Sequence, residues 1–292
     1  MIVEVMLNGI ALGMVYALVA VGYSLVFGIL RLINFSHGSV YTFGAHMVAM
    51  YVAAEFGIVL GLLCGILTTA VLGVSIDKIA LEPLRKKNAI PIASLITTIG
   101  VSYVISNMLM VIFGSEKKRF PAFYSFGSFK IGENINITSS QIVMAATSLI
   151  LMVVLTIVVN KTRIGLAMRA TEQNRRAAHL MGVNVNFVIS FTFFLGAASA
   201  AIAGALVGGY YEIYYPTMGV IIGLKAFAAA VLGGIGSLYG SVIGGLAVGV
   251  IESLAATVLG STYRDAIAFV LLILVLTIRP IGFFGKKEIT KV

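Results

Sequence analysis

Three ionisable residues lie within or at the edges of long apolar stretches, where they could carry charge chemistry inside a membrane: Glu55, Lys225 and Glu252. A charged side chain in hydrocarbon is costly, and such residues often pair with one another or mark the path of an ion or substrate. Lys225 and Glu252 could form an ion pair, although long side chains can also reach the membrane surface. We therefore take Lys225 and Glu252 as candidate pathway or interface residues.

Two histidines, His37 and His46, form the second group that could do chemistry, as metal ligands or proton carriers. Nine residues of α-helix span roughly 13.5 Å, which is too far for both side chains to bind one ion, and zinc sites need three or four ligands. The sequence therefore predicts no metal site. His37, in "NFSHG", is expected to cap a helix or to pack between subunits, and it joins the candidate pathway or interface residues.

Known catalytic patterns are missing from the sequence. Ser36 and His37 do not become a nucleophile and its base by adjacency, and neither a Gly-x-Ser-x-Gly nor a His-Glu-x-x-His string occurs. The single cysteine, Cys64 in "GLLCGIL", is expected to pack as a small apolar residue. We therefore predict that the chain is not an enzyme.

The elements that hold these side chains must be membrane helices. The chain has 292 residues, of which 60% are hydrophobic and only 11% charged, with a mean hydropathy of +1.06. Soluble domains carry roughly 25% charged residues, and a helix needs roughly 20 apolar residues to cross the hydrocarbon core. We predict an all-α transmembrane helix bundle, one domain over residues 1–292, with eight to ten membrane segments.

Nine segments are placed along the chain. They are 5–30, 36–54, 56–76, 88–115, 138–160, 187–211, 217–234, 237–256 and 264–279. Segment 217–234 is short and contains Lys225, so we expect a broken or re-entrant helix there.

The net charge of +9 is explained by topology and not by nucleic-acid binding, because the basic residues flank the predicted spans. By the positive-inside rule, the three basic clusters are cytoplasmic. They comprise Lys78, Arg85, Lys86 and Lys87; Lys161, Arg163, Arg169, Arg175 and Arg176; and Arg279, Lys286, Lys287 and Lys291. Residues 116–137 then form an outer loop, in which "FKIGENINI" could make a hairpin, and the N-terminus lies outside.

Glycines recur at intervals of four in several spans. Residues four apart lie on one face of a helix, and small residues there let neighbouring helices approach closely. The spacing predicts tight packing within the chain or against a partner. The pairs include Gly9/Gly13, Gly204/Gly208 and Gly245/Gly249.

The longest polar stretch is "KTRIGLAMRATEQNRRAAHLMGVNVN", residues 161–186, which we expect to be a cytoplasmic loop. It predicts an amphipathic helix of about three turns, with Thr171 as its N-cap and Gly182 in the left-handed conformation that ends it. Glu172, Arg175 and Arg176 can face water, whereas Ala177, Ala178, Leu180 and Met181 can bury against something apolar. Such a helix could lie on lipid, pack beneath the bundle or dock in a groove of a soluble partner.

The same stretch resembles part of a known family. "RRAAHLMGVNV" is similar to the Ala-Ala-x-x-x-Gly loop of ABC importer permeases, except that Arg176 stands where a glutamate usually precedes the alanines. Residues 17–46 and 223–252 closely resemble the N- and C-terminal signatures of high-affinity branched-chain amino acid permeases. The resemblance runs nearly end to end. Without the longer N-terminal extension of the companion permease, the chain resembles the shorter of the two paired subunits.

The resemblance implies a permease subunit of an ATP-driven importer, spanning a bacterial or archaeal cytoplasmic membrane several times and embedded in its lipid. It also implies three kinds of partner protein: two ATPase subunits, a second permease that makes a heterodimer, and a periplasmic amino-acid-binding protein. A short coupling helix of this chain would contact the ATPases. No Gly-x4-Gly-Lys-Ser/Thr string occurs, so ATP is expected on the partner subunits and no cofactor is expected in this chain. The implied coupling residues are Arg175, Arg176, Ala177, Ala178 and Gly182.

Other functions remain open on the sequence alone. The same architecture could carry urea, short amides or other amino acids. An ion-coupled secondary transporter would use Glu55, Lys225 or Glu252 to bind ions and would need no ATPase. A membrane enzyme is a third class, which would turn over a substrate without moving it.

Overall fold

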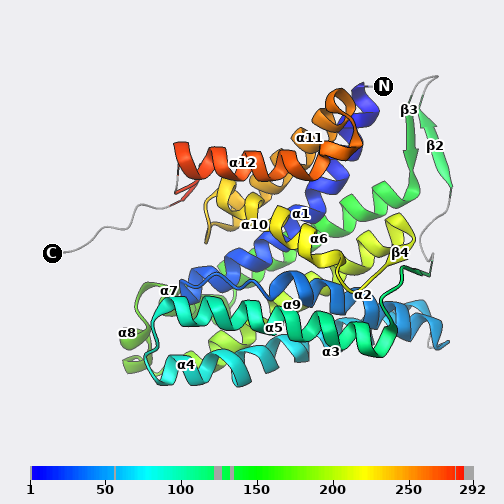
Figure 1. Cartoon of the computed structure of the whole chain (residues 1–292). Coiled ribbons are helices and arrows are strands. Elements are labelled where there is room, and N and C mark those ends of the chain that lie inside the picture. Colours follow the sequence, from blue (N-terminus) through cyan, green and yellow to red (C-terminus); the bar gives the residue numbers. More distant parts are fainter. Residues whose placement is uncertain (1, 56, 122–126, 132–134, 280, 286–292) are drawn as a thin grey trace.

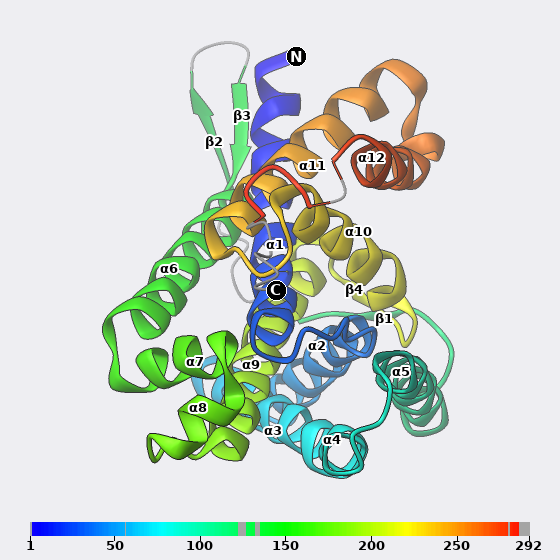
Figure 2. The ribbon, with the colours of Figure 1, turned by 90° about the vertical axis from the view of Figure 1, so that its left-hand side faces the viewer.

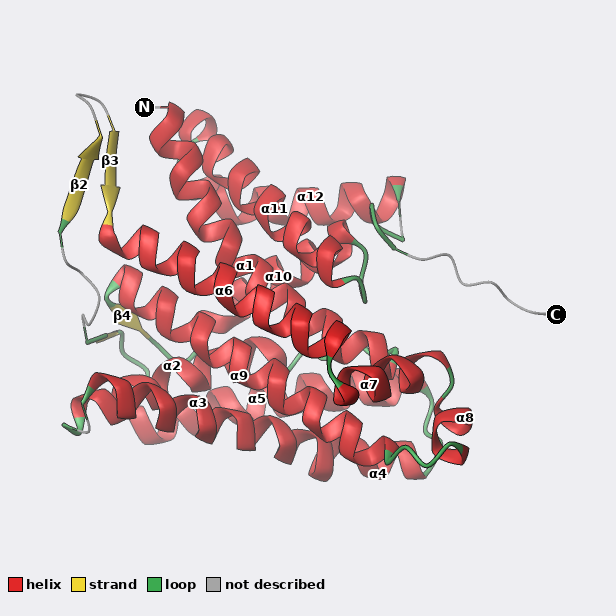
Figure 3. Cartoon of the chain, turned by 180° about the vertical axis from the view of Figure 1, so that it is seen from behind, coloured by secondary structure: helices red, strands yellow, loops and turns green. Residues whose placement is uncertain are grey.

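The computed structural model describes residues 2–55, 57–121, 127–131, 135–279 and 281–285, and almost all of them are helical (Figure 3). The longer helices are α1 (Ile2–Leu30), α2 (His37–Ala53), α3 (Ile58–Ser75), α5 (Pro91–Phe113), α6 (Ser139–Lys161), α9 (Val185–Tyr211), α10 (Met218–Gly233), α11 (Leu238–Leu259) and α12 (Arg264–Ile278). The shorter ones are the π-helix η1 (Ile76–Leu81), α4 (Glu82–Lys86), α7 (Arg163–Gln173), α8 (Arg175–Leu180) and the 3₁₀-helix η2 (Ser261–Tyr263).

The nine predicted segments each coincide with one of the longer helices, so the all-α transmembrane bundle is confirmed. Seven helices of the described chain are long and apolar enough to span a membrane, while α2 and α10 have only 17 and 16 residues. At 1.5 Å per residue, α10 is roughly 24 Å long, shorter than the roughly 30 Å hydrocarbon core. The expected break in this segment is wrong, because α10 runs unbroken; the alternative of a re-entrant helix stays a prediction.

The bundle has two distinct ends (Figure 1). The start of α1 lies at the same end as the antiparallel hairpin of β2 (Ser128–Ile131) and β3 (Ile135–Thr138), which confirms the predicted hairpin. A second antiparallel pair joins β1 (Lys118–Arg119) to β4 (Ile213–Tyr214). Helices α4, α7 and α8 lie at the opposite end, as the charge pattern predicts for the cytoplasmic side.

Helix α1 forms the core of the bundle. It is apolar on every face, as expected of a helix surrounded by protein or lipid, and it packs against α6, α9, α10 and α11. Its closest partner is α11, where Gly9 and Gly13 face Gly245 and Gly249 across the interface. A Cβ atom added to Gly249 would lie 2.3 Å from Gly13 Cα, so only glycine permits this approach. The predicted tight packing is therefore confirmed within this chain.

Helices α2 and α10 meet near their first turns. Gly219 N donates to Thr42 Oγ1 at 2.9 Å, and a Cβ on Gly38 would lie 2.4 Å from Gly219 O. Helix α2 also packs against α5, so it lies between α5 and α10 along one side of the molecule (Figure 2). This arrangement positions the cavity described below.

Candidate functional site

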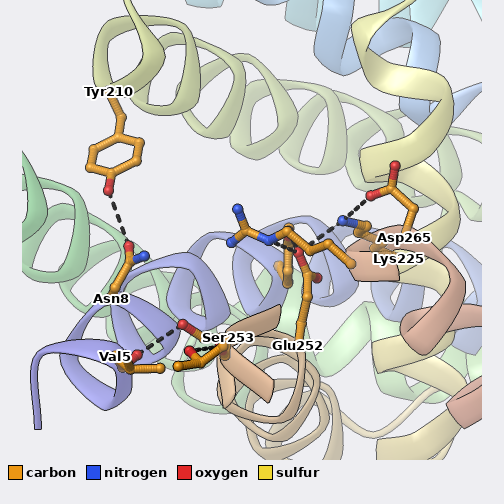
Figure 4. Close-up of polar contacts among 10 residues, drawn as sticks. Val5, Asn8, Tyr210, Lys225, Glu252, Ser253 and Asp265 are labelled. Carbon is orange, nitrogen blue, oxygen red and sulfur yellow. Dashed lines mark hydrogen bonds and ion pairs between the residues drawn. The ribbon is translucent and has the colours of Figure 1, made fainter. Parts of the chain in front are cut away.

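Four charged side chains meet where α12 joins the helix bundle (Figure 4). Those of Lys225 and Glu252 are buried, whereas the side chains of Arg264 and Asp265 are 26% and 50% exposed. Lys225 Nζ lies 2.9 Å from Glu252 Oε1 and 2.7 Å from Asp265 Oδ1. Arg264 Nε donates to Glu252 Oε1 at 2.6 Å, and the hydroxyl of Tyr16 donates to the same oxygen at 3.2 Å. Lys225 and Glu252 are 4% and 1% exposed, so water has little access to the pair.

This charge cluster joins four helices: Tyr16 comes from α1, Lys225 from α10, Glu252 from α11, and Arg264 and Asp265 from the first turn of α12. Two cations and two anions cancel, which is the arrangement that makes buried charges tolerable in a low-dielectric interior. Helix α12 is otherwise poorly covered, because only 11% of the residues in the apolar stretch Ser261–Ile278 are buried inside the chain. The cluster therefore supplies a specific attachment of α12 to the bundle.

The cluster offers limited room for other chemistry. Glu252 Oε1 already accepts from three donors, and Lys225 contacts two carboxylates. Within the described residues, Glu252 Oε2 is buried without a hydrogen-bond partner, so it is one acceptor still able to accept a hydrogen bond. Beside the cluster, Arg264 borders an open, polar cavity of about 370 Å³ between the start of α1 and the end of α11.

The predicted Lys225–Glu252 pair is thus confirmed, whereas Arg264 and Asp265 were missed. The available signal was a pair of opposite charges at the start of an apolar segment, but nothing in the sequence linked it to Glu252. Glu55 lies apart, exposed in the turn between α2 and α3.

His37 lies away from the charge cluster, buried inside this chain at 3% exposure. Its ring packs edge-on against Tyr23, with centroids 4.7 Å apart, and Nε2 points at Gly22. The predicted helix cap is wrong, because Ser36 occupies the N-cap and His37 is the first residue of α2.

The polar segment 161–186 forms two helices, not one. Asn174 has extended backbone angles that separate α7 from α8, and its Oδ1 accepts from Ala177 N at 3.0 Å. Thr171, the predicted cap, lies within α7 and donates instead to Ala167 O at 2.8 Å. The predicted helix start is therefore wrong. Gly182 has φ +85°, the predicted left-handed conformation.

The two faces of α8 also differ from prediction. Leu180 and Met181 are 81% and 84% exposed, whereas Ala178 is 4% exposed. Arg175 turns inward, and its Nη2 donates at 2.8 Å to the carbonyl of Ile29 in the last turn of α1. The expectations that Ala177, Leu180 and Met181 bury and that Arg175 faces water are wrong for this chain alone, because Arg175 and Ala178 occupy the face that meets the bundle.

A buried ion pair lies near this anchor. Arg85 Nη1 lies 2.5 Å from Asp77 Oδ1, and Ser190 Oγ donates to Asp77 Oδ2 at 2.7 Å. Asp77 belongs to η1 and Arg85 to α4, so the ion pair joins these two short helices, and the hydrogen bond from Ser190 holds η1 against α9. Burial, and secondarily the charge of Arg85, lower the pKa of Arg175, which still stays protonated at neutral pH. Sequence reasoning missed Asp77 and Ser190.

A second, partly open cavity of about 350 Å³ lies between α2, α5 and α10. Among the residues that the structure describes, its lining has no acidic, basic or histidine side chain. Hydroxyl and amide side chains, among them three serines and Asn107, line part of it, and apolar side chains, both aliphatic and aromatic, line most of the rest.

Comparison with known proteins places the chain in a family. A family model described as "Branched-chain amino acid transport system / permease component" matches residues 5–276. The chain is 40% identical to the high-affinity branched-chain amino acid transport system permease protein LivH of Salmonella typhimurium, over 98% of this chain and 96% of that protein. It is 39% identical to the corresponding permease protein BraD of Pseudomonas aeruginosa, over 98% and 97%.

The structure of PsaBC from Streptococcus pneumoniae in complex with Fab matches with a TM-score of 0.50 at 13% identity, covering 94% of this chain and 91% of that one. That likeness concerns the fold alone. Family profile, relatives and membrane-spanning helices agree on a multi-pass protein of the cytoplasmic membrane. This chain therefore belongs to the family of permease components of branched-chain amino acid transport systems.

Proposed function

We propose that the chain is the membrane-spanning permease subunit of an ATP-driven importer that moves branched-chain amino acids into the cell. The match to LivH and BraD over nearly the whole length supports the substrate class. Two ATPase subunits supply the energy, a second permease completes the path, and a periplasmic binding protein delivers the amino acid. ATP binds to the ATPase subunits and not to this chain.

The exposed tip of α8, Leu180 and Met181, is the observation that supports docking of the ATPase subunit at this end of the chain. Leu180 and Met181 present two large apolar side chains to solvent at the end where the basic residues gather. Exposed apolar side chains on an otherwise polar helix are typical of a protein-binding surface. This tip, with Arg176 and Ala177 beside it, is the surface that meets the ATPase.

The other face of α8 connects the ATPase contact to the helix bundle. Ala178 packs inward and Arg175 hydrogen-bonds to the last turn of α1, so a displacement of α8 acts on the central helix of the bundle. We assign Arg175 and Ala178 to this anchoring, Arg176 and Ala177 to the ATPase contact, and Gly182 to ending the helix.

The experiment is purification of the tagged chain from its native membrane, followed by mass spectrometry of what stays bound. Met181→Asp should lose the ATPase subunits while keeping the second permease, because a charge enters the apolar contact. Met181→Leu is the matched control and should keep both. Arg176→Glu tests the same surface, whereas reversing Arg175 would also break its bond to Ile29 and is uninformative about docking.

Radiolabelled leucine uptake by the purified complex in vesicles tests the substrate class. Uptake that needs ATP and the binding protein supports the proposal. Recovery of this chain alone, competent for uptake driven by an ion gradient, would overturn it in favour of a secondary transporter. ATP-dependent uptake of urea or short amides in place of leucine would overturn the substrate class only.

A further inference from the structure

The cavity between α2, α5 and α10 has the size and chemistry of a small-molecule site. Its volume of about 350 Å³ falls within the roughly 300–1,000 Å³ of ligand pockets, which are mostly apolar with a few placed polar groups. The apolar part of its lining includes Ile99, Met110, Val220 and Leu224. These side chains could surround a branched hydrocarbon of the size of an amino-acid side chain.

The polar part is a row of hydroxyls that crosses from α2 to α5. Ser39 Oγ lies 2.7 Å from Ser102 Oγ and 3.2 Å from Ser106 Oγ, and all three residues line the cavity. Each hydroxyl has one donor and two acceptor positions, so the row retains hydrogen-bonding capacity for a ligand. Asn107, one residue further, donates to Tyr103 O at 2.8 Å and also lines the cavity.

The absence of charge in this lining restricts the ligand. A net charge would be left uncompensated in a low-dielectric wall, whereas a zwitterion has no net charge and can share its two ends among hydroxyl and amide groups. Neutral groups bind such ends weakly, and a conduction path needs sites weak enough to release what they bind. The lining is therefore better suited to binding an apolar amino acid weakly during transport than to holding it tightly.

One side of the cavity is open. Tyr103 and Val220 line it and are still 68% and 49% exposed. A solute there would be sheltered by this chain on one side only, and the second permease of the proposed function supplies the facing wall. The opposite side is rigid, because Gly38, Gly219 and Gly223 bring α2 and α10 into backbone contact.

We propose that this cavity is the part of the solute path contributed by this chain, with Ser39, Ser102, Ser106 and Asn107 contacting the polar ends of an apolar amino acid. The inference rests on the proposed function and adds the residues that select the solute. Ser39, Ser102 and Ser106 do so by hydrogen bonding, and the aliphatic residues by fitting the side chain.

The test compares two variants of α5 in the complete complex of both permeases, the ATPases and the binding protein. Ser102→Leu fills the cavity, whereas Thr97→Leu removes a hydroxyl from the same helix outside the cavity lining. We expect leucine uptake to fall about tenfold or more in Ser102→Leu, the lower end of what altered pocket contacts give, and less than about twofold in Thr97→Leu. ATP hydrolysis stimulated by the binding protein should stay within about twofold in both, since docking is untouched.

A second form of the test avoids a folding defect. In a Cys64→Ala background, Ser102→Cys and Thr97→Cys differ little in volume from the native residues and are modified with a bulky thiol reagent after assembly. Blocked uptake only for modified Ser102→Cys, with modification checked by mass spectrometry, supports the path. Equal uptake in the two modified variants, or failure of Ser102→Cys to react, would overturn it.

The two proposals fail in different ways. If the wild-type complex shows no ATP-dependent leucine uptake, the proposed function is wrong. If the wild type transports and both Ser102 variants transport like their Thr97 controls, the function stands and this cavity is not the path. Lipid extracted in fixed stoichiometry from wild type but not from Ser102→Leu, with uptake unchanged, would assign the cavity to an acyl chain instead.

Discussion

Replacing Glu252 by glutamine tests whether the charge cluster stabilises the bundle. The change is nearly isosteric and keeps an acceptor for Tyr16, Lys225 and Arg264, but it turns a neutral cluster into one with a net charge of +1. Breaking a buried ion pair by removing one partner costs about 3–5 kcal/mol, and single hydrogen bonds in membrane proteins average about 0.6 kcal/mol. Since glutamine retains weaker hydrogen bonds, we expect a loss of about 3 kcal/mol in the free energy of unfolding.

The assay is thermal unfolding of the purified chain in detergent or nanodiscs. For chains of a few hundred residues, 1 kcal/mol corresponds to roughly 2–4 °C in Tm, so Glu252→Gln should lower Tm by roughly 6–12 °C. Glu82→Gln is the matched control, because Glu82 also contacts two cations, Lys78 and Lys86, but these lysines are exposed. Exposed pairs contribute about 0–1 kcal/mol, so its Tm should change by only a few degrees.

A double variant separates charge balance from packing. Lys225→Met combined with Glu252→Gln leaves Arg264 and Asp265 to balance each other, so its loss should be smaller than the sum of the two single losses. Equal shifts for Glu252→Gln and Glu82→Gln, or strict additivity in the double variant, would refute the reasoning. An ion-coupled transporter predicts the reverse pattern for Glu252→Gln: ion-dependent uptake disappears and Tm is unchanged.

Three further changes test other parts of the structure. Gly249→Ala places a Cβ 2.3 Å from Gly13 Cα and should cost about 1–3 kcal/mol of unfolding free energy, seen as a lower Tm. At Gly100 a Cβ meets nothing within 4 Å, so Gly100→Ala should leave Tm unchanged. Equal effects of the two changes would contradict the close α1–α11 contact. Gly182→Val puts a β-branched residue at φ +85°, which should destabilise the end of α8 by about 1–2 kcal/mol. We expect less leucine uptake per ATP hydrolysed, with membrane insertion intact. Normal leucine uptake would argue against a coupling role for this helix end. Thr138→Val removes the hydroxyl that accepts from Gln141 N at the start of α6, but keeps the backbone N–H that donates to Gln141 Oε1. The loss of this half of the capping box should cost about 1 kcal/mol, so an unchanged Tm would show that this cap is not needed.

Hydropathy and length were enough to place the membrane helices, because each must satisfy its own backbone hydrogen bonds in lipid and is therefore a long local element. Glycine spacing likewise predicted close contacts, and the Gly245/Gly249 pair makes them. Spacing could not identify the partner, since Gly9 and Gly13 lie more than 200 positions away in the sequence. The charge cluster was predictable only in part for the same reason. An acidic residue such as Glu252 in an apolar span predicts that a cation lies nearby, but only the tertiary fold shows that both Lys225 and Arg264 contact it.

The polar segment shows how local signals can compete. Thr171 and Asn174 both belong to residue types that cap helices, and the predicted helix began at Thr171 alone. In the structure Asn174 Oδ1 accepts from Ala177 N, and Thr171 hydrogen-bonds back within α7. The direction of Leu180 and Met181 was predicted wrongly for a different reason. An amphipathic pattern shows which residues seek an apolar surface, but not whether that surface belongs to the same chain.

The pairing of α1 with α11 also has a consequence for how the protein is made. Ribosomes add roughly 5–20 residues per second, and Gly13 emerges more than 230 residues before Gly249, so α1 waits on the order of ten seconds or longer for its main partner. During that time its glycine face and Tyr16 must be shielded by lipid, by the insertion machinery or by a temporary neighbour. Nonsense mutations that end the chain before α11 should therefore leave an orphaned first helix, which membrane quality-control proteases can recognise even though most of the spans have already been inserted.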